Sequence, residues 1–491
     1  KGTKMRNKDM KTTVLSSLIW RFAERCGAQG ISFIVTIVLA RLIAPEAYGT
    51  IAIINVFINI LSVFIDSGMG SALIQKKDAD ELDFSSLFFF NMGMCCLLYC
   101  ILFFSAPLIA KFYNNNELVP LVRVIGLFLI VSGIKNVQQA YVSRYMLFKR
   151  FFFSTLGGTL VSAIVGIAMA YAGLGVWALV AQSLSNAIID TIILWITVKW
   201  RPVLQFSITR VKALFSFGWK LLCSSLLDTV YNNLRNMIIG KLYSAADLAY
   251  YNKADSFPNL IVNNINSSIN SVLFPAMSSV QDQRETVKAM TRRSIMVSTY
   301  IMAPLMIGLA FVSEPLVSLL LTDKWLACVP YMRIFCITYM FYPIHTANLS
   351  AIKAMGRSDL FLKLEIVKKT VGLTVLLITM KHGVLVMAYS LLFVSVMGQI
   401  INSWPNRKLL NYGYLEQIKD ILPGIILSVV MGGCIYPIQW LGLSNLGTIS
   451  LQVLLGVAIY MILSQLFKVQ SYQYVWDLVK PYLKIDKRKN K

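Results

Sequence analysis

The chain has 491 residues, of which 57% are hydrophobic and only 14% are charged, an apolar excess that the core of a soluble domain cannot absorb. Apolar segments of about 20 residues, the length that crosses the hydrocarbon core of a bilayer, recur from end to end and leave no room for a separate soluble domain. The formal net charge of +23 would indicate nucleic acid only if the basic residues formed a binding surface, so their positions decide its meaning.

About fourteen segments, set apart by polar and Gly/Pro-rich joints, are predicted to cross the membrane as helices. The fold class is therefore predicted to be all-α and polytopic. The first segment contains charged residues and continues as a full span, so we expect no cleavable signal peptide. The predicted spans are 12–40, 48–75, 84–110, 118–143, 152–172, 175–198, 212–240, 247–276, 294–312, 328–352, 366–380, 384–403, 421–438 and 447–467.

The basic residues are distributed unequally between alternate connections. If the N-terminus is cytoplasmic, the cytoplasmic connections hold 33 Lys and Arg residues and the opposite connections hold 5. This bias predicts that both termini face the cytoplasm, and it explains the net charge without nucleic acid. Eight basic residues remain inside predicted spans: Arg21, Arg25, Arg123, Lys135, Lys220, Arg235, Lys253 and Arg333.

The sequence contains an internal repeat at an offset of about 200 residues. One copy holds Asn55, Asn59, Asp66, Ser71 and Leu73, and the other holds Asp255, Asn259, Asn266, Ser271 and Leu273. A second match joins Ser105 to Leu108 and Arg123 with Ser313 to Leu316 and Arg333. Repeats of six spans have the same orientation in the membrane, which favours a transporter with a pathway between two lobes. The predicted divisions are 1–200 and 201–405 for the lobes and 406–491 for two extra spans with a basic tail.

Polar residues form stripes at helical spacing in five predicted spans, and such residues normally face a bundle interior or a wet cavity. Cations exceed carboxylates within the spans, which favours an anion such as a phosphate, and amides suit sugar hydroxyls. The residues expected to bind a diphosphate are Arg21, Arg25, Lys220, Arg235 and Lys253. Those expected to bind sugar are Gln29, Asn55, Asn59, Asn186, Asn232, Asn259, Asn263 and Asn266. Those that could bind a coupling cation are Glu24, Asp66, Asp190 and Asp228.

Structural alternatives exist for several of these residues. Glu24 and its two arginine neighbours have the spacing of a local ion pair. Asp190 and Asp228 could pair inside the bundle, and Arg123 and Arg333 could extend to the membrane interface. The asparagines between 259 and 270 could join helices through hydrogen bonds.

No motif indicates covalent chemistry, a cofactor or a metal. The two histidines, His345 and His382, are too far apart for a metal cluster, and His345 is interpreted as a residue satisfied inside the bundle. The eight cysteines lie in or beside apolar segments and are interpreted as packing residues. The sequence has no P-loop, so we expect a protein that is not an enzyme and that draws energy from gradients, substrate supply or a partner.

The sequence resembles the Wzx-type polysaccharide flippases, close to the colanic-acid-exporter branch, within the multidrug/oligosaccharidyl-lipid/polysaccharide exporter superfamily. The resemblance covers nearly the whole chain. It is carried by residues 37–49 (IVLARLIAPEAYG), 64–77 (FIDSGMGSALIQKK), 175–182 (GVWALVAQ), 245–255 (AADLAYYNKAD) and 356–369 (GRSDLFLKLEIVKK).

The resemblance implies two six-helix lobes in a V with two C-terminal helices, which open alternately to each side of the membrane. It also implies the movement of an undecaprenyl-diphosphate-linked oligosaccharide from the cytoplasmic to the periplasmic leaflet of the bacterial inner membrane. Membrane lipid, a polysaccharide polymerase and the chain-length machinery are the partners it suggests. A multidrug-type cation antiporter, a glycan polymerase or ligase, and a non-transporting scaffold stay open as alternatives. The basic excess argues against the first, and the short outward connections argue against the second.

Overall fold

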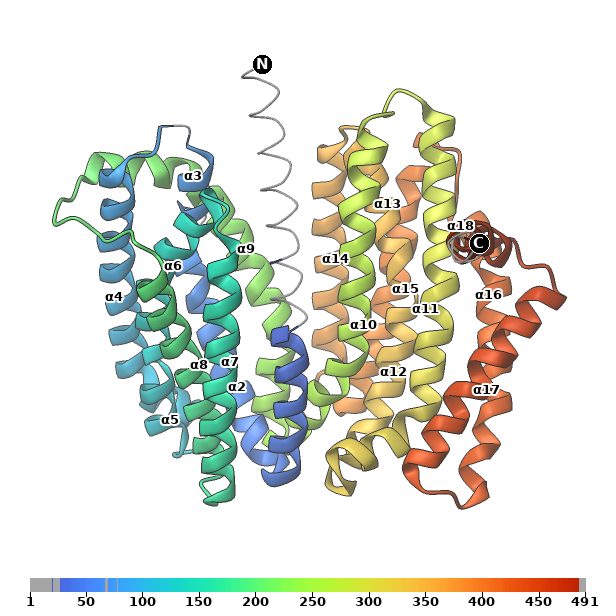
Figure 1. Ribbon diagram of the computed structural model, residues 1–491, viewed down its shortest axis with the longest axis horizontal. Coiled ribbons are helices and arrows are strands. Elements are labelled where there is room, and N and C mark those ends of the chain that lie inside the picture. The colour runs from blue at the N-terminus through green and yellow to red at the C-terminus, as the bar shows by residue number, and fades with distance from the viewer. Residues whose placement is uncertain (1–19, 21–26, 67–68, 77, 485–491) are drawn as a thin grey trace, which may run out of the picture. The chain divides into compact units, whose positions relative to one another are not determined.

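The computed structural model describes residue 20 and residues 27–66, 69–76 and 78–484, and Figure 1 shows that long helices dominate it. No strand occurs among these described residues, which confirms the predicted all-α fold class. An unlabelled helical segment, Gly27–Leu42, comes first. It is followed by α2 (Pro45–Asp66), α3 (Met69–Gln75), α4 (Glu81–Tyr113), α5 (Leu118–Ile125), α6 (Leu127–Arg144), α7 (Phe148–Tyr171), α8 (Val176–Thr197) and α9 (Ile208–Leu242). Next come α10 (Ala245–Ser278), α11 (Arg284–Leu321), η1 (Asp323–Cys328), α12 (Val329–Met340), α13 (Tyr342–Ala354), α14 (Ser358–Thr379), α15 (Val384–Leu409), α16 (Tyr414–Ile435), η2 (Tyr436–Leu441), α17 (Asn445–Leu466) and α18 (Gln470–Lys484).

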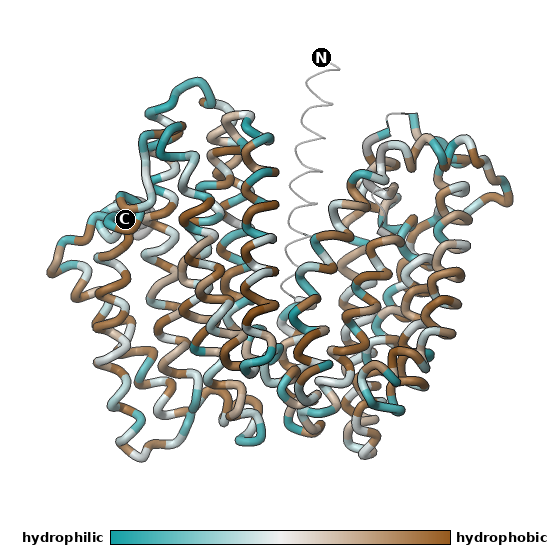
Figure 2. Tube along the Cα trace, turned by 180° about the vertical axis from the view of Figure 1, so that it is seen from behind, coloured by the Kyte–Doolittle hydropathy of each residue, from teal (hydrophilic) through white to brown (hydrophobic). Residues whose placement is uncertain are grey.

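Ten helical segments of the described chain are long and apolar enough to cross a membrane. Three further predicted spans fall on α9, α10 and α14, which have 35, 34 and 22 residues. At 1.5 Å per residue these helices are long enough to span the hydrocarbon core, but their polar and charged residues make them less apolar. The remaining predicted span, 12–40, lies only partly within the described residues, so the number fourteen stays a prediction. Hydrophilic residues gather at helix ends and connections in Figure 2, as expected for membrane-spanning helices.

Two of the predicted spans are interrupted helices. The span at 118–143 consists of α5 and α6, which meet at Gly126, and the span at 328–352 consists of α12 and α13, which meet at Phe341. The hydroxyl of Tyr99 donates to the carbonyl of Arg123 over 3.2 Å beside the first interruption. At the second, Pro343 follows within two residues, and proline has no N–H with which to continue the preceding helix.

The contacts divide the chain into two compact units, residues 1–249 and 250–491. In unit 1, α7 lies along α8, α4 packs on α5 and α6, and α9 packs on α2, α3 and α4. In unit 2, α11 packs on α12, α13, α16, α17 and α18, while α14 lies along α15. The predicted divisions at residues 200 and 405 follow the sequence repeat instead of these contacts, and they stay a prediction.

The two units contain matching cores. In unit 1, a cluster of buried side chains including Phe84, Val137 and Leu194 joins α4, α6 and α8. In unit 2, a cluster including Ile295 and Ile344 joins α11 and α13 and continues into the residues that follow α15. Because α11 and α13 follow α4 and α6 by about one repeat, an equivalent pair of helices contributes to both cores. This agreement supports the internal repeat seen in the sequence.

Candidate functional site

The cationic stripe predicted on the seventh span lies on α9. Lys220, Asp228 and Asn232 are exposed on the surface of unit 1, and Arg235 is half-buried. The ammonium of Lys220 lies 6.0 Å from the centroid of the neighbouring Trp219 ring. These positions are eight, four and three residues apart, which places them on one face of α9, and this face presents charge and amide groups at the surface of unit 1.

Helix α2 adds amides next to this face. Asn55 and Asn59 are exposed, and the Asn59 amide nitrogen is 3.4 Å from the side-chain oxygen of Asn233 on α9. Gln29, in the segment before α2, is also exposed. The structure therefore brings the polar faces of α2 and α9 together within unit 1. Arg21, Glu24 and Arg25 lie outside the described residues, as does the side chain of Asp66.

Helix α10 divides the predicted residues between the inside and the surface of unit 2. Lys253 is buried, with its ammonium 5.2 Å from the centroid of the Trp325 ring. Asn259 donates to Asp255 over 3.1 Å, and the Tyr339 hydroxyl donates to the same carboxylate. These contacts place Lys253 and Asp255 inside the unit and show that Asn259 orients the Asp255 carboxylate.

Further along α10 the amides are more accessible. Asn263 is exposed and Asn266 is half-buried. The Thr346 hydroxyl on α13 donates to the Asn266 oxygen over 3.1 Å, and Ser350 donates to Asn270 over the same distance. Asn266 and Asn270 thus join two helices of unit 2, as in the interhelical alternative, while Asn263 is available at the surface.

Two predicted residues of the sixth span lie inside unit 1. Asp190 on α8 is paired with Lys135 on α6 at 2.9 Å, with side chains 10% and 18% exposed. Asn186 donates to the Ser162 hydroxyl over 3.2 Å. A Cβ at Gly158 on α7 would lie 2.9 Å from the Asn186 carbonyl and 3.0 Å from the Asp190 Cβ, so only glycine permits this approach of α7 to α8. For Asp190 this arrangement matches the alternative of pairing inside the bundle.

The repeated arginines make repeated contacts. Arg123 directs its guanidinium over the Phe103 ring at 4.3 Å and its Nε to the Phe103 carbonyl at 3.4 Å. Arg333 directs its Nε to the Ser313 hydroxyl at 3.2 Å and pairs with Glu314 at 3.4 Å. Each arginine thus bonds to a residue twenty positions earlier, on the helix that precedes its own, so both hold helices together within their units.

Unit 2 also contains a buried amide network that the stripes did not reveal. Asn348, Ser403, Asn406 and Gln417 are fully buried. The Asn348 amide donates to Gln417 over 2.8 Å, and Asn406 donates to the Asn348 side-chain oxygen over 2.6 Å. The hydrogen bonds of this network join α13, α15 and α16. The spacing of polar residues along one helix therefore could not predict it.

His345 lies close to this network and is itself satisfied. Its Nδ1 is 2.9 Å from the Asn402 amide nitrogen, and its Nε2 is 3.5 Å from the Ser395 hydroxyl. This is the bundle residue that the sequence predicted. In the described part of the chain, no three His, Cys, Asp or Glu residues are grouped so that they could hold a metal ion.

Charged residues outside the spans form a compact group at the start of α4. Asp83 pairs with Lys76 at 2.5 Å and with Arg210 at 3.4 Å, and Asp80 pairs with Arg210 at 3.2 Å. Asp80 also accepts the Asp83 amide as the N-cap of α4. That hydrogen bond and the Arg210 charge lower the pKa of Asp80. The group fixes the connection between α2 and α4 against the start of α9.

An apolar groove of about 510 Å³ lies in unit 2 among α10, α11, α16 and α17. Leu305, Leu309, Val453 and Val457 are among its walls, and Gln452 is one of its few polar residues. Such a surface suits a hydrocarbon chain, because burying apolar groups needs no polar partner.

The long apolar helices and the matching cores define a multi-pass α-helical membrane protein. Its fold is that of a solved lipid II flippase, MurJ in an inward closed conformation, with a TM-score of 0.72 and 15% identity over 92% of this chain and 98% of that one. The chain belongs to the family described as polysaccharide biosynthesis protein, whose model matches residues 38–330.

Curated relatives agree with this family. The chain is similar to the teichuronic acid biosynthesis protein TuaB of Bacillus subtilis strain 168, with 28% identity over 383 residues, 75% of this chain and 77% of the relative. It is also similar to the lipopolysaccharide biosynthesis protein WzxC of Escherichia coli K12, with 23% identity over 439 residues, 86% of this chain and 88% of the relative. The family and the fold confirm the resemblance predicted from the sequence.

Proposed function

We propose that this protein is a flippase that moves an undecaprenyl-diphosphate-linked oligosaccharide from the cytoplasmic to the periplasmic leaflet of the bacterial inner membrane. Membership in the polysaccharide biosynthesis family supports the glycan, and the fold shared with a lipid II flippase supports a lipid-linked substrate. The excess of basic residues in alternate connections supports an orientation with both termini in the cytoplasm. A polymerase and the chain-length machinery would then receive the product on the periplasmic side.

The observation that carries this proposal is the exposed polar face of α9. Lys220, Asp228 and Asn232 lie on the surface of unit 1 although α9 has the length of a membrane span. Charged side chains in contact with lipid are costly, so such a face requires a water-filled chamber. We place the glycan and the diphosphate in that chamber, against the polar face that α9 and α2 form in unit 1.

Residues of the chamber differ in the role that their positions support. Lys220 and Arg235 are assigned to the diphosphate, since Arg and Lys form strong charge-assisted hydrogen bonds with phosphate. Arg21 and Arg25 are assigned to it from the sequence alone. Lys253 is buried beside Trp325, so we assign it to the packing of unit 2 in the described conformation.

The amides assigned to sugar are those on accessible faces. Asn55, Asn59, Asn232 and Asn263 are exposed, and amides offer both donors and acceptors to hydroxyl groups. Asn186 is half-buried against Ser162, so we assign it to helix packing. Asp228 is the described carboxylate that best suits a coupling cation, because it is exposed on the same face of α9.

The polyprenyl tail requires a different surface from the glycan. A bare diphosphate in hydrocarbon is very unfavourable, whereas the tail is most stable there. The apolar groove of about 510 Å³ in unit 2 can hold part of a hydrocarbon chain while the headgroup is in water. Flipping then needs only the headgroup to cross the membrane through the chamber.

The test is transport by the full chain in proteoliposomes. Undecaprenyl-diphosphate-linked oligosaccharide is placed in one leaflet, and its appearance in the other is measured with an enzyme that modifies only exposed glycan. A charge-assisted hydrogen bond contributes about 1.5–3 kcal/mol, so Lys220→Gln and Arg235→Gln should each slow transport by roughly 10-fold to 150-fold at limiting substrate.

Lys212→Gln is the matched control, because Lys212 is an exposed cation near the start of the same helix. Its transport rate should equal that of the wild type, and all variants should unfold at the same temperature. Full activity of the Lys220 and Arg235 variants would show that α9 does not bind the diphosphate. Movement of cationic dyes but not of glycolipid would show a multidrug antiporter, and joined glycan units would show a polymerase.

A further inference from the structure

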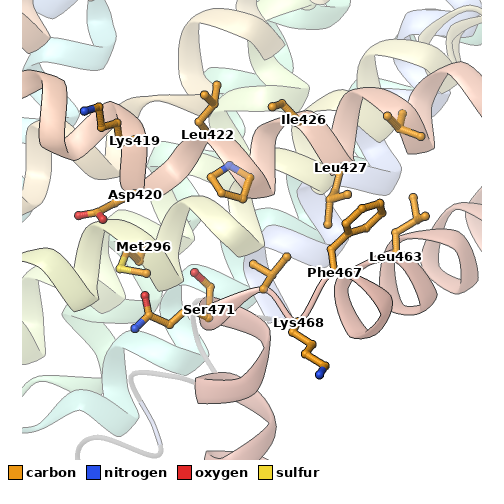
Figure 3. A pocket seen from close by; sticks show the side chains of 14 residues that line it. Met296, Lys419, Asp420, Leu422, Ile426, Leu427, Leu463, Phe467, Lys468 and Ser471 are labelled. Atoms are coloured by element: carbon orange, nitrogen blue, oxygen red, sulfur yellow. The ribbon is translucent and has the colours of Figure 1, made fainter.

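A second cavity, of about 760 Å³, lies in unit 2 where α16, α17 and the start of α18 meet. It is separate from the polar face of α9 and from the groove assigned to the tail. Figure 3 shows its lining side chains, with Met296 of α11 on one side and Phe467 at the end of α17 on the other.

One wall of this cavity is apolar and open to the surroundings. Leu422, Ile426 and Val430 follow one another at every fourth residue of α16 and are 44–50% exposed. Phe467 is 65% exposed. On a membrane-spanning helix such a wall contacts acyl chains, because exposed apolar surface in water would be unfavourable.

The mouth of the cavity carries positive charge. Lys419 and Lys468 are exposed and line it at two edges (Figure 3). The one carboxylate in the lining, Asp420, is bound in bidentate fashion by Arg292 at 2.8 and 2.6 Å and accepts the Tyr412 hydroxyl at 2.7 Å. Among the described residues neither lysine forms an ion pair with a carboxylate, so the mouth has a net attraction for an anion.

Helix α18 lies across the direction of the neighbouring helices of unit 2. Figure 1 shows α18 end-on, whereas α16 runs along the height of the picture and α17 runs obliquely beside it. Helix α18 packs against α11 and α17. The guanidinium of Arg293 on α11 lies 4.3 Å from the centroid of the Tyr474 ring on α18. A short helix that lies across its neighbours, with aromatic residues and a basic sequence after it, is typical of the membrane interface, so we assign the mouth to the depth of the lipid headgroups.

We propose that this cavity binds one anionic phospholipid of the bilayer, with its phosphate at the mouth lined by Lys419 and Lys468 and an acyl chain along Leu422 and Ile426. The charge at the mouth selects an anionic headgroup, and the apolar wall selects a lipid instead of a free phosphate. Gln470 and Ser471, which also line the cavity, offer hydrogen-bond donors to the headgroup. The proposal is independent of the glycan that the protein transports.

The experiment uses the full chain purified with native lipids and measures bound phosphatidylglycerol and phosphatidylcholine by native mass spectrometry during stepwise removal of lipid. The wild type should retain one phosphatidylglycerol and release phosphatidylcholine. Each lysine near an anionic surface contributes roughly a factor of five in affinity. The double variant Lys419→Gln/Lys468→Gln should therefore bind phosphatidylglycerol about 30-fold more weakly.

Two further variants separate the cavity from general surface charge. Lys363→Gln/Lys408→Gln removes two exposed lysines from connections predicted to face the same side of the membrane, and it should retain the lipid. Ile426→Trp fills the cavity without changing its charge, and it should release the lipid. Equal retention of phosphatidylcholine, equal loss in the control variant, or a co-purified protein that occupies this surface would overturn the proposal. None of these measurements contains the glycolipid, so their outcome is independent of flipping.

Discussion

The ion pair between Lys135 and Asp190 gives the sharpest test of how unit 1 is built. The perturbation is a set of three variants: Asp190→Asn, Lys135→Met and the two together. Each single change leaves one charge without its partner in the interior of the unit, where the side chains of Asp190 and Lys135 are only 10% and 18% exposed. The double change leaves neither charge.

The expected magnitudes follow from the burial of the pair. Removal of one partner of a buried ion pair costs about 3–5 kcal/mol, because the other charge loses its partner while it stays away from water. Removal of both costs far less, since the attraction between the charges and the cost of taking them out of water nearly cancel. We expect each single variant to lose about 3 kcal/mol of the free energy of unfolding and the double variant to lose about 1 kcal/mol.

Unfolding by sodium dodecyl sulfate in mixed micelles is monitored by circular dichroism. Transport by the same variants is measured in proteoliposomes. The double variant should fold and transport. If Asp190→Asn has wild-type stability, the reasoning about the buried pair is wrong. If the double variant is folded but transports no glycolipid, Asp190 binds a coupling cation, which is the other role that the sequence allows.

Two further predictions concern other parts of the fold. Asn348→Leu removes the donor at 2.8 Å from the buried Gln417 side-chain oxygen and the acceptor at 2.6 Å from the buried Asn406 amide, so it should lower the free energy of unfolding by about 2 kcal/mol; an unchanged detergent unfolding midpoint would contradict this role. The pKa of Asp80 is lowered from 3.8, chiefly by the hydrogen bond from the Asp83 amide, so its stabilising effect is present above pH 3.8 and is lost as the pH falls through the lower folded-state value. The stability difference between wild type and Asp80→Asn should therefore shrink between pH 5 and pH 2, and a difference independent of pH would refute this assignment.

Part of the candidate site follows from single helices. The stripe from Lys220 to Arg235 can be seen in the sequence because side chains three and four residues apart share a helix face. The structure places Lys220, Asp228 and Asn232 on the surface of unit 1. The same polar residues lower the mean hydropathy of α9, so α9 is not among the helices whose length and apolar composition indicate a membrane span.

Other parts of the site depend on contacts between distant residues. Lys135 and Asp190 are 55 residues apart, and Tyr339 and Asp255 are 84 apart. A stripe shows that a polar face exists, but it does not show whether a neighbouring helix covers that face. For this reason the sequence grouped Lys253 and Asp190 with accessible residues, although both are buried in the structure.

The sequence by itself determined the membrane class, the helical fold and the family, because apolar length, helical spacing and short sequence matches are local properties of the chain. Only the tertiary structure decided which polar groups are paired, since pairing depends on how closely helices approach. Gly158 illustrates the difference: in the sequence it is one of 28 glycines, but in the fold it lets α7 approach Asp190 closely. Close packing of helices, and not composition, decides which polar side chains pair inside the bundle and which remain exposed to a substrate.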